Sequence, residues 1–218
     1  MIASAKCLIV FACFALTLGS ATDRMAQARP PQILEIYRDY LKPEAVAANR
    51  KLEKRAERLC RTLDFRHPYL TIESISAPAE MWYFNGFESQ AEVETLRREY
   101  EQNAKLAAAL NEIVQQKAPL KCAQSTDEFA RYRSDLSSGD PWIIGRGQFL
   151  VIVFFKGDPP LNGTVFEMMD GSRMLVRTTQ TSSEAYVLAS SAGSTARVFR
   201  SYFYFRPQGD VDRWFSAP

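Results

Sequence analysis

Two carboxylates in strand-like segments are the side chains of this sequence best placed to do chemistry. Glu35 and Tyr37 alternate with apolar residues in the run QILEIYRDYL, and Glu73 alternates with apolar residues in YLTIESI. Because successive residues of a strand point to opposite faces, Glu35 and Tyr37 share one face. A carboxyl group partly buried against aromatic rings has a raised pKa and can act as a general acid or base. Glu35 and Glu73 are therefore the candidate catalytic residues.

The run MWYFNGF, residues 81–87, supplies candidate ligand-binding residues. Trp82 and Phe84 share one face of this strand and Asn85 lies on the other, so either face could line a cavity with Tyr37. If helices cover the apolar face of the neighbouring strands, the acids and rings turn toward an enclosed hollow. That apolar face consists of Leu34, Ile36, Leu70 and Ile72. The alternative is that the acids lie on a solvated or internally paired face of an ordinary sheet.

The chain has a single histidine, His67. One histidine excludes a pair of histidine metal ligands and the facial triad of two histidines and a carboxylate. We therefore expect no metal and no cofactor. His67 lies between Arg66 and Pro68 at the entry to a strand, a position typical of a side chain that fixes a loop.

The first 28 residues have the layout of a secretory signal peptide. Lys6 precedes the apolar run CLIVFACFALTLG, whose 13 residues are too few for a transmembrane helix of about 20. Small residues then allow cleavage after Ala21 or after Ala28. The mature chain should be exported, periplasmic or secreted, with no transmembrane segment.

Two cysteines remain in the mature chain, and an oxidising compartment favours a disulfide between them. A bond between Cys60 and Cys122 would close a loop of about 60 residues and contribute roughly 4 kcal/mol in the chain-entropy model. The alternative is two free thiols buried as small apolar residues.

Composition excludes one class of partner and supports a packed core. The net charge is +2 and no basic run occurs, so nothing indicates nucleic acid. Apolar residues at 46% and aromatic residues at 12% are enough for a globular domain.

Periodicity predicts the elements that must position the candidates. The first half should hold three strands and two helical regions: strands at 32–41, 69–75 and 81–87, helices at 44–63 and 89–115, with a bend at 102–103. The second half should hold four strands and a short helix: strands at 147–155, 164–169, 173–179 and 197–207, and a helix at 181–192. These elements give a ferredoxin-like split βαβ half and a degenerate β-rich half, together an α+β barrel-like sheet. The divisions are 1–28 signal and leader, 29–116 first half, 117–146 linker or crossover, 147–207 second half and 208–218 tail.

The segments ILEIYRDYLKPEA, YLTIES, MWYFNGFES and EYEQNAKLAAAL, in this order, resemble the dimeric α+β barrel superfamily over residues 32–115. That superfamily includes NIPSNAP proteins and antibiotic-biosynthesis monooxygenases. Glu44 stands where such proteins prefer glycine after the proline. The resemblance implies a barrel closed by two halves of one chain or by a homodimer. It also implies haem ligation by His67 as an option, since haem-degrading relatives use a histidine.

Three functions follow from these expectations. The first is binding of a small apolar or aromatic ligand in a sheet-lined cavity. The second is a cofactor-poor monooxygenase or isomerase, with Glu35 or Glu73 as the base and Tyr37 or Asn85 orienting the substrate. The third is a structural or interaction protein without a ligand.

Overall fold

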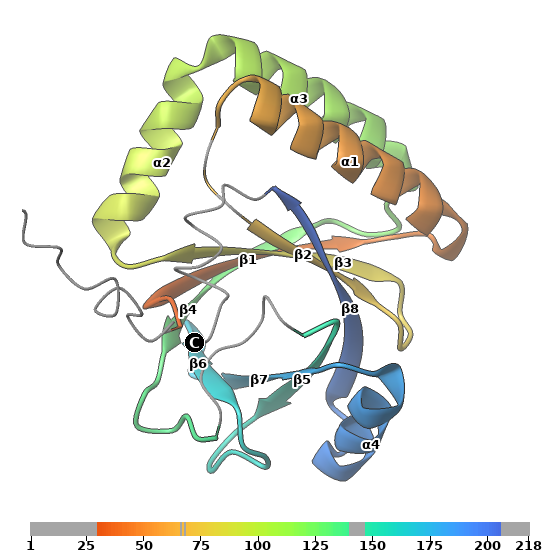
Figure 1. Ribbon diagram of the computed structural model, residues 1–218, viewed down its shortest axis with the longest axis vertical. Coiled ribbons are helices and arrows are strands. Elements are labelled where there is room, and N and C mark those ends of the chain that lie inside the picture. Colours follow the sequence, from red (N-terminus) through yellow and green to blue (C-terminus); the bar gives the residue numbers. More distant parts are fainter. Residues whose placement is uncertain (1–29, 66, 68, 140–146, 206–218) are drawn as a thin grey trace, which may run out of the picture.

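A computed structural model describes residues 30–65, 67, 69–139 and 147–205, so the predicted signal peptide and tail lie outside the described residues. The chain forms eight strands and four α-helices in these ranges (Figure 1). The strands are β1 (Ile33–Tyr40), β2 (Tyr69–Ser74), β3 (Glu80–Phe87), β4 (Thr126–Tyr132), β5 (Phe149–Phe155), β6 (Thr164–Met168), β7 (Arg173–Thr179) and β8 (Ala196–Phe205). The helices are α1 (Val46–Thr62), α2 (Gln90–Gln102), α3 (Ala104–Lys117) and α4 (Ser182–Ala192), with 3-10 turns at Pro43–Ala45 and Ala118–Leu120.

All eight strands join one closed antiparallel barrel within a single chain. The strand order is β1-β3-β2-β8-β5-β7-β6-β4, and β4 pairs back onto β1. The expectation of an α+β barrel is thus confirmed. The segment interpreted as a linker, 117–146, contains β4, whose residues TDEFARY join the two halves by pairing with β1 and β6. Its polar residues hid the strand, because only Ala130 of the seven is fully buried.

Helices cover the barrel from outside (Figure 1). The arch formed by α1, α2 and α3 lies over the first-half strands, and α4 packs on β5 and β8. The predicted bend is confirmed, since α2 ends at Gln102 and Asn103 caps α3 by accepting from the Leu106 backbone N–H at 3.0 Å. The capping box before α2 is present too, because Ser89 accepts from the Glu92 N–H at 3.3 Å. None of the described helices has both the length and the apolar character needed to cross a bilayer.

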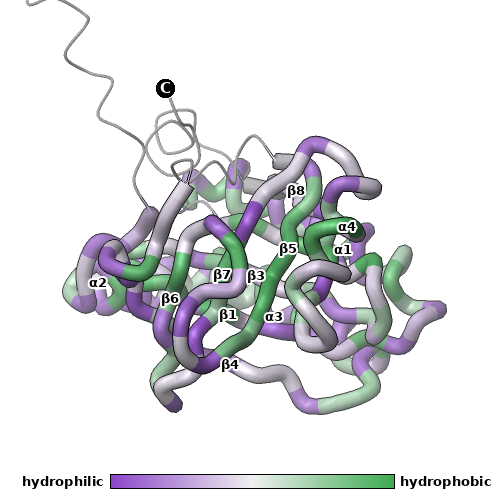
Figure 2. Tube along the Cα trace, turned by 90° about the horizontal axis from the view of Figure 1, so that it is seen from below, coloured by the Kyte–Doolittle hydropathy of each residue, from purple (hydrophilic) through white to green (hydrophobic). Residues whose placement is uncertain are grey.

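The barrel interior is filled by large apolar side chains from strands of both halves. Figure 2 shows one of these strands, β5, as hydrophobic along its course. The interior includes Leu34, Ile36, Leu70, Ile72, Trp82, Phe84, Ala130, Leu150, Ile152, Phe166, Met168, Met174, Val176 and Phe199.

The prediction of which face of the first-half strands lies inside the barrel is therefore wrong. The apolar residues of β1 and β2 that were expected beneath helices point into the barrel, while Glu35, Tyr37 and Glu73 point outward toward the helices. The reason is that the interior of an eight-stranded barrel is just wide enough for side chains to fill, and large apolar residues fill it here, while the outer face is buried as well. Residues on both faces of β3 are buried, so alternation alone identifies two faces without saying which one is inside.

The predicted disulfide is absent, and both Cys60 and Cys122 are free thiols. The Cys122 N–H donates to the Tyr40 carbonyl, beside the start of α1. Cys60 lies about 14 residues further along that helix, roughly 21 Å away at 1.5 Å per residue. A disulfide needs Cα atoms within about 7 Å. Burial and the Glu53 carboxylate raise the pKa of the Cys60 thiol to about 11.

Candidate functional site

The helix-covered face of β1 and β3 carries three of the predicted site residues, Glu35, Tyr37 and Asn85. Glu35 and Asn85 pair across these two strands, as do Tyr37 and Tyr83. This face is the candidate functional site. It has a partly open end near Glu35 and a buried centre near Tyr83, which is 8% exposed.

Glu35 is held by two neighbours at the open end. Its Oε2 accepts from Asn85 Nδ2 at 3.1 Å, and its Oε1 lies 3.4 Å from the Arg97 guanidinium of α2. Only 16% of the Glu35 side chain is exposed. Burial raises the Glu35 pKa, the Asp127 carboxylate on β4 raises it further, and the contacts with Asn85 and Arg97 lower it in part. A carboxyl group of this kind can exchange a proton closer to neutral pH than an exposed one.

Glu35→Gln is expected to gain stability relative to the parent as pH rises from acid to neutral. A pKa raised by folding means that the folded state holds the proton more tightly. The contribution of Glu35 is therefore fully favourable below its unfolded pKa and is lost as pH rises through the folded pKa. Urea unfolding of both proteins at a series of pH values measures this difference. Exposed Glu94→Gln is the control for the substitution itself, and a stability difference for Glu35→Gln that does not change with pH would contradict the assignment.

A groove of about 500 Å³ opens beside Glu35 on the outer face of the sheet. Its residues come from β1, α2, β4, β6 and the β6–β7 turn: Ile33, Gln90, Arg97, Phe129, Ala130, Arg131, Glu167, Met168, Met169 and Gly171. Arg97 contacts both this groove and Glu35, and it lies 5.7 Å from the centre of the Phe129 ring. Phe129 is directly opposite Glu35 in the β1–β4 register.

The other predicted site residues are divided between separate places. Glu73 binds Arg50 of α1 through both oxygens, at 2.8 and 2.7 Å, which commits its carboxylate to an ion pair. Trp82 and Phe84 lie inside the barrel, with ring centres 6.2 Å apart. The structure thus brings Glu35 and Asn85 together and separates them from the rings of Trp82 and Phe84, which lie on the other face of the sheet.

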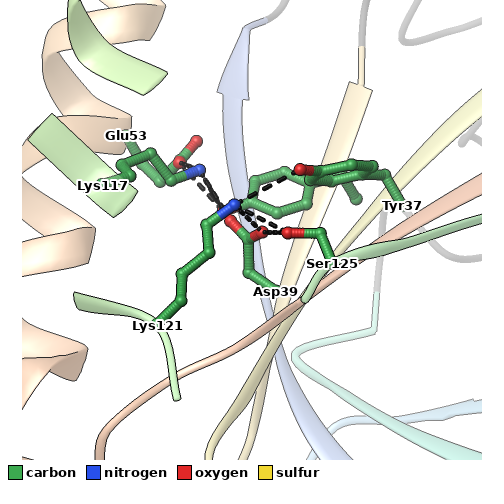
Figure 3. A network of polar contacts seen from close by, with 7 residues as sticks. Tyr37, Asp39, Glu53, Lys117, Lys121 and Ser125 are labelled. Carbon is green, nitrogen blue, oxygen red and sulfur yellow. Dashed lines mark hydrogen bonds and ion pairs between the residues drawn. The ribbon is translucent and has the colours of Figure 1, made fainter. Parts of the chain in front are cut away.

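A buried network of charged groups, which the strand and helix periodicity does not predict, occupies the centre of the face (Figure 3). Lys117 of α3 lies 3.0 Å from Asp39 of β1 and 2.7 Å from Glu53 of α1. The Tyr83 hydroxyl donates to Glu53 at 2.9 Å and accepts from Lys117 Nζ at 2.8 Å. Lys121 lies 2.5 Å from the second oxygen of Asp39.

The remaining contacts carry this network toward its more exposed edge. Lys121 donates to the Tyr37 hydroxyl at 3.3 Å and to Ser125 at 2.7 Å, and Ser125 donates to Asp39 at 2.7 Å. Tyr37, the predicted ligand-binding residue, is therefore a hydrogen-bonding partner of the network (Figure 3).

Burial and charge set the protonation states in the network. Burial opposes the charges of Asp39 and Lys117, but their attraction prevails, so the pKa of Asp39 is lowered and that of Lys117 is raised. Burial and the carboxylates of Glu53 and Asp39 raise the pKa of Tyr83 well above its usual value. The hydroxyl of Tyr83 therefore stays protonated and can donate to Glu53.

A helical spacing could have identified part of this network. The buried residues of α1 are Asn49, Glu53, Ala56 and Cys60, at steps of four, three and four. The leucines of this helix indicate a different stripe, yet neither Leu52 nor Leu59 is fully buried. Two polar residues on the buried face are the signal of a buried polar site.

His67 lies near the end of this face that carries Glu35, where Phe87 of β3 is opposite Ile33 of β1. Its ring stacks on Phe87 of β3, with ring centres 4.9 Å apart and planes at 14°. In the described part of the chain no three His, Cys, Asp or Glu side chains are arranged to hold a metal ion.

Comparisons with known proteins add two distant structural likenesses. No family model matches the chain, and no curated protein matches it. A crystal structure titled "putative monooxygenase" from Fusobacterium nucleatum is 6% identical, with a TM-score of 0.49, covering 80% of this chain and 93% of that one. Another with the same description, from Lactobacillus acidophilus, is 7% identical, with a TM-score of 0.46, covering 79% and 93%.

Proposed function

We propose that this protein binds a small molecule with an anionic group and an apolar or aromatic body in the groove beside Glu35. The observation that carries the proposal is the groove itself, whose volume of about 500 Å³ falls within the range of ligand pockets. It combines the apolar surface of Ile33, Phe129 and Met169 with two arginines.

The charge balance of the groove favours an anion. Arg131 has no carboxylate within ion-pair distance among the described residues, and Arg97 reaches Glu35 only at 3.4 Å. The acid of the groove, Glu167, is already committed to Arg133 at 2.8 Å. Guanidinium groups bind carboxylates and phosphates through two parallel hydrogen bonds, so a ligand carboxylate suits this pair of arginines.

An enzyme is the second candidate function, and the setting of Glu35 favours it. The raised pKa of this carboxyl group suits proton transfer to or from a ligand in the adjacent groove. A cofactor-poor isomerase needs such a base, with Asn85 holding one oxygen of Glu35 at 3.1 Å. Glu73 is not part of this candidate, because Arg50 engages both of its oxygens.

Arg97→Gln is expected to weaken binding of 2-naphthoate about 10-fold, because a hydrogen bond to a charged group contributes roughly 1.5 kcal/mol or more. Isothermal titration with 2-naphthoate and its neutral analogue 2-naphthamide measures the effect. The parent should prefer the anion, and Arg97→Gln should lose that preference. Arg98→Gln, the next exposed residue on α2, is the matched control and should bind like the parent. Equal binding of the two ligands by the parent would refute the proposal.

We further propose that the chain is exported and that its two halves are ferredoxin-like repeats. The signal-like layout of residues 1–28 supports export. The orders β4-β1-β3-β2 and β8-β5-β7-β6 support the repeat, since each places the third strand of its half between the first and second. In the second half, the loop between β5 and β6 replaces the first helix. Amino-terminal sequencing of the protein from its own host tests export.

A further inference from the structure

Two fully buried polar side chains, one on α1 and one on β2, have polar atoms without a hydrogen-bond partner among the described residues. Asn49 and Thr71 are both 0% exposed. Neither polar atom of the Asn49 amide nor the Thr71 hydroxyl oxygen has a hydrogen-bond partner among the described residues. Buried polar groups destabilise a fold unless protein atoms or bound molecules pair with them. These three atoms therefore indicate a binding site.

Contacts on either side place the two residues together. Arg50, which follows Asn49 on α1, binds Glu73 and lies 5.4 Å from the centre of the Tyr202 ring. Thr71 shares the outer face of β2 with Glu73 and is opposite Tyr202 in the β2–β8 register. The turn of α1 that carries Asn49 and Arg50 therefore lies above Thr71.

Tyr83 connects this point to the charged network. It is opposite Thr71 in the β2–β3 register. The Asn49 amide lies near the Tyr83 hydroxyl and acts to lower the pKa of that hydroxyl, but the contact does not have the distance and angles of a hydrogen bond. A molecule between Asn49, Thr71 and Tyr83 would join the unpaired groups to the hydroxyl that Glu53 and Lys117 hold.

The surrounding charges decide what class of molecule fits. Asp39 and Glu53 supply two negative charges to the network, and Lys117 and Lys121 supply two positive charges. Because these charges cancel, a charged occupant would be buried without a counter-charge, which is strongly unfavourable.

The hydrogen-bonding groups narrow the class further. The Asn49 amide offers a donor and an acceptor, and the Thr71 hydroxyl offers both. We infer that Asn49 and Thr71 bind one small uncharged molecule that donates and accepts hydrogen bonds, of which water is the smallest example. This site is separate from the groove and does not depend on the proposed function.

A double-mutant cycle on the mature protein tests the inference. Thr71→Val removes the hydroxyl and keeps the shape, and Asn49→Leu removes the amide at similar volume. Each should lower Tm by about 2–6 °C, because each leaves the bound molecule and its other partner unsatisfied. The double variant should lose clearly less than the sum, since both residues hold the same molecule. A matched control pairs Asn49→Leu with Thr126→Val, a hydroxyl on β4 that also lacks a partner among the described residues, and should be additive.

Either of two results in this cycle would contradict the inference. If Thr71→Val leaves Tm unchanged or raises it, or if the two effects add, then no shared molecule is bound and the inference fails. Native mass spectrometry of the parent identifies the source of the molecule. A mass equal to the bare chain assigns the site to water, and a mass excess that Asn49→Leu abolishes assigns it to a small polar metabolite.

Discussion

Lys117→Met is expected to lower the free energy of unfolding by about 3–5 kcal/mol, because removing one partner from a buried ion pair leaves an uncompensated charge. Lys117 is 8% exposed, and its partners Asp39 and Glu53 are 0% and 3% exposed. Methionine keeps the apolar length of the side chain, so the change removes charge and hydrogen bonds more than volume. Urea unfolding near neutral pH measures the loss.

Two further variants separate this effect from general damage to α3. Lys105→Met changes an exposed lysine of the same helix and should cost less than about 0.5 kcal/mol. Glu53→Gln in the Lys117→Met background should recover part of the loss, because Lys121 still neutralises Asp39 at 2.5 Å and Glu53 is the unpaired acid. A loss in Lys117→Met no larger than in Lys105→Met would show that the network is not buried as described.

Trp82→Ala is expected to lower the free energy of unfolding by about 3–5 kcal/mol, the range for removing a large aromatic from a packed core. The Trp82 ring is 1% exposed and lies 4.8 Å from Phe199 and 6.0 Å from Phe154. Its indole N–H donates to Glu80 at 2.9 Å, so alanine also removes a hydrogen bond of a buried acid. Urea unfolding measures this loss as well.

Tyr186→Ala is the matched aromatic control, because this ring on α4 is 45% exposed, and its loss should be clearly smaller. Trp82→Phe then tests whether the ring takes part in ligand binding. Since Trp82 lies inside the barrel and the groove lies outside, the affinity of Trp82→Phe for 2-naphthoate should stay within about twofold of the parent. A loss of affinity comparable to that of Arg97→Gln would show that Trp82 takes part in ligand binding.

The predicted strands and helices were largely right because local periodicity and turn residues determine them. The bend between α2 and α3 follows from Gln102 and Asn103 interrupting an apolar stripe, and β5 from an unbroken apolar run. The strand β4 was missed because its sequence is mixed, and it pairs with β1 and β6, strands far from it in the sequence.

The candidate site was harder to predict because it depends on which face of β1 is inside. The sequence correctly puts Glu35 and Tyr37 on one face, but alternation is symmetric, and both faces of the sheet are covered here. Asp39 lies on the same face and follows the same alternation along β1 as Glu35 and Tyr37. Its importance comes from Lys117, which is 78 residues later in the sequence and reaches it only through the packing of α3 on α1.

The central claim is that the face of β1 and β3 bearing Tyr83 lies beneath the helices while the face bearing Trp82 fills the barrel. Nuclear Overhauser contacts from these two neighbouring rings test it most directly. The structure predicts contacts from the Tyr83 ring to the side chain of Lys117, whose Nζ lies 4.6 Å from the ring centre, and from the Trp82 indole to the Phe199 ring. Contacts of Tyr83 with Phe199 and of Trp82 with Lys117 would contradict the claim.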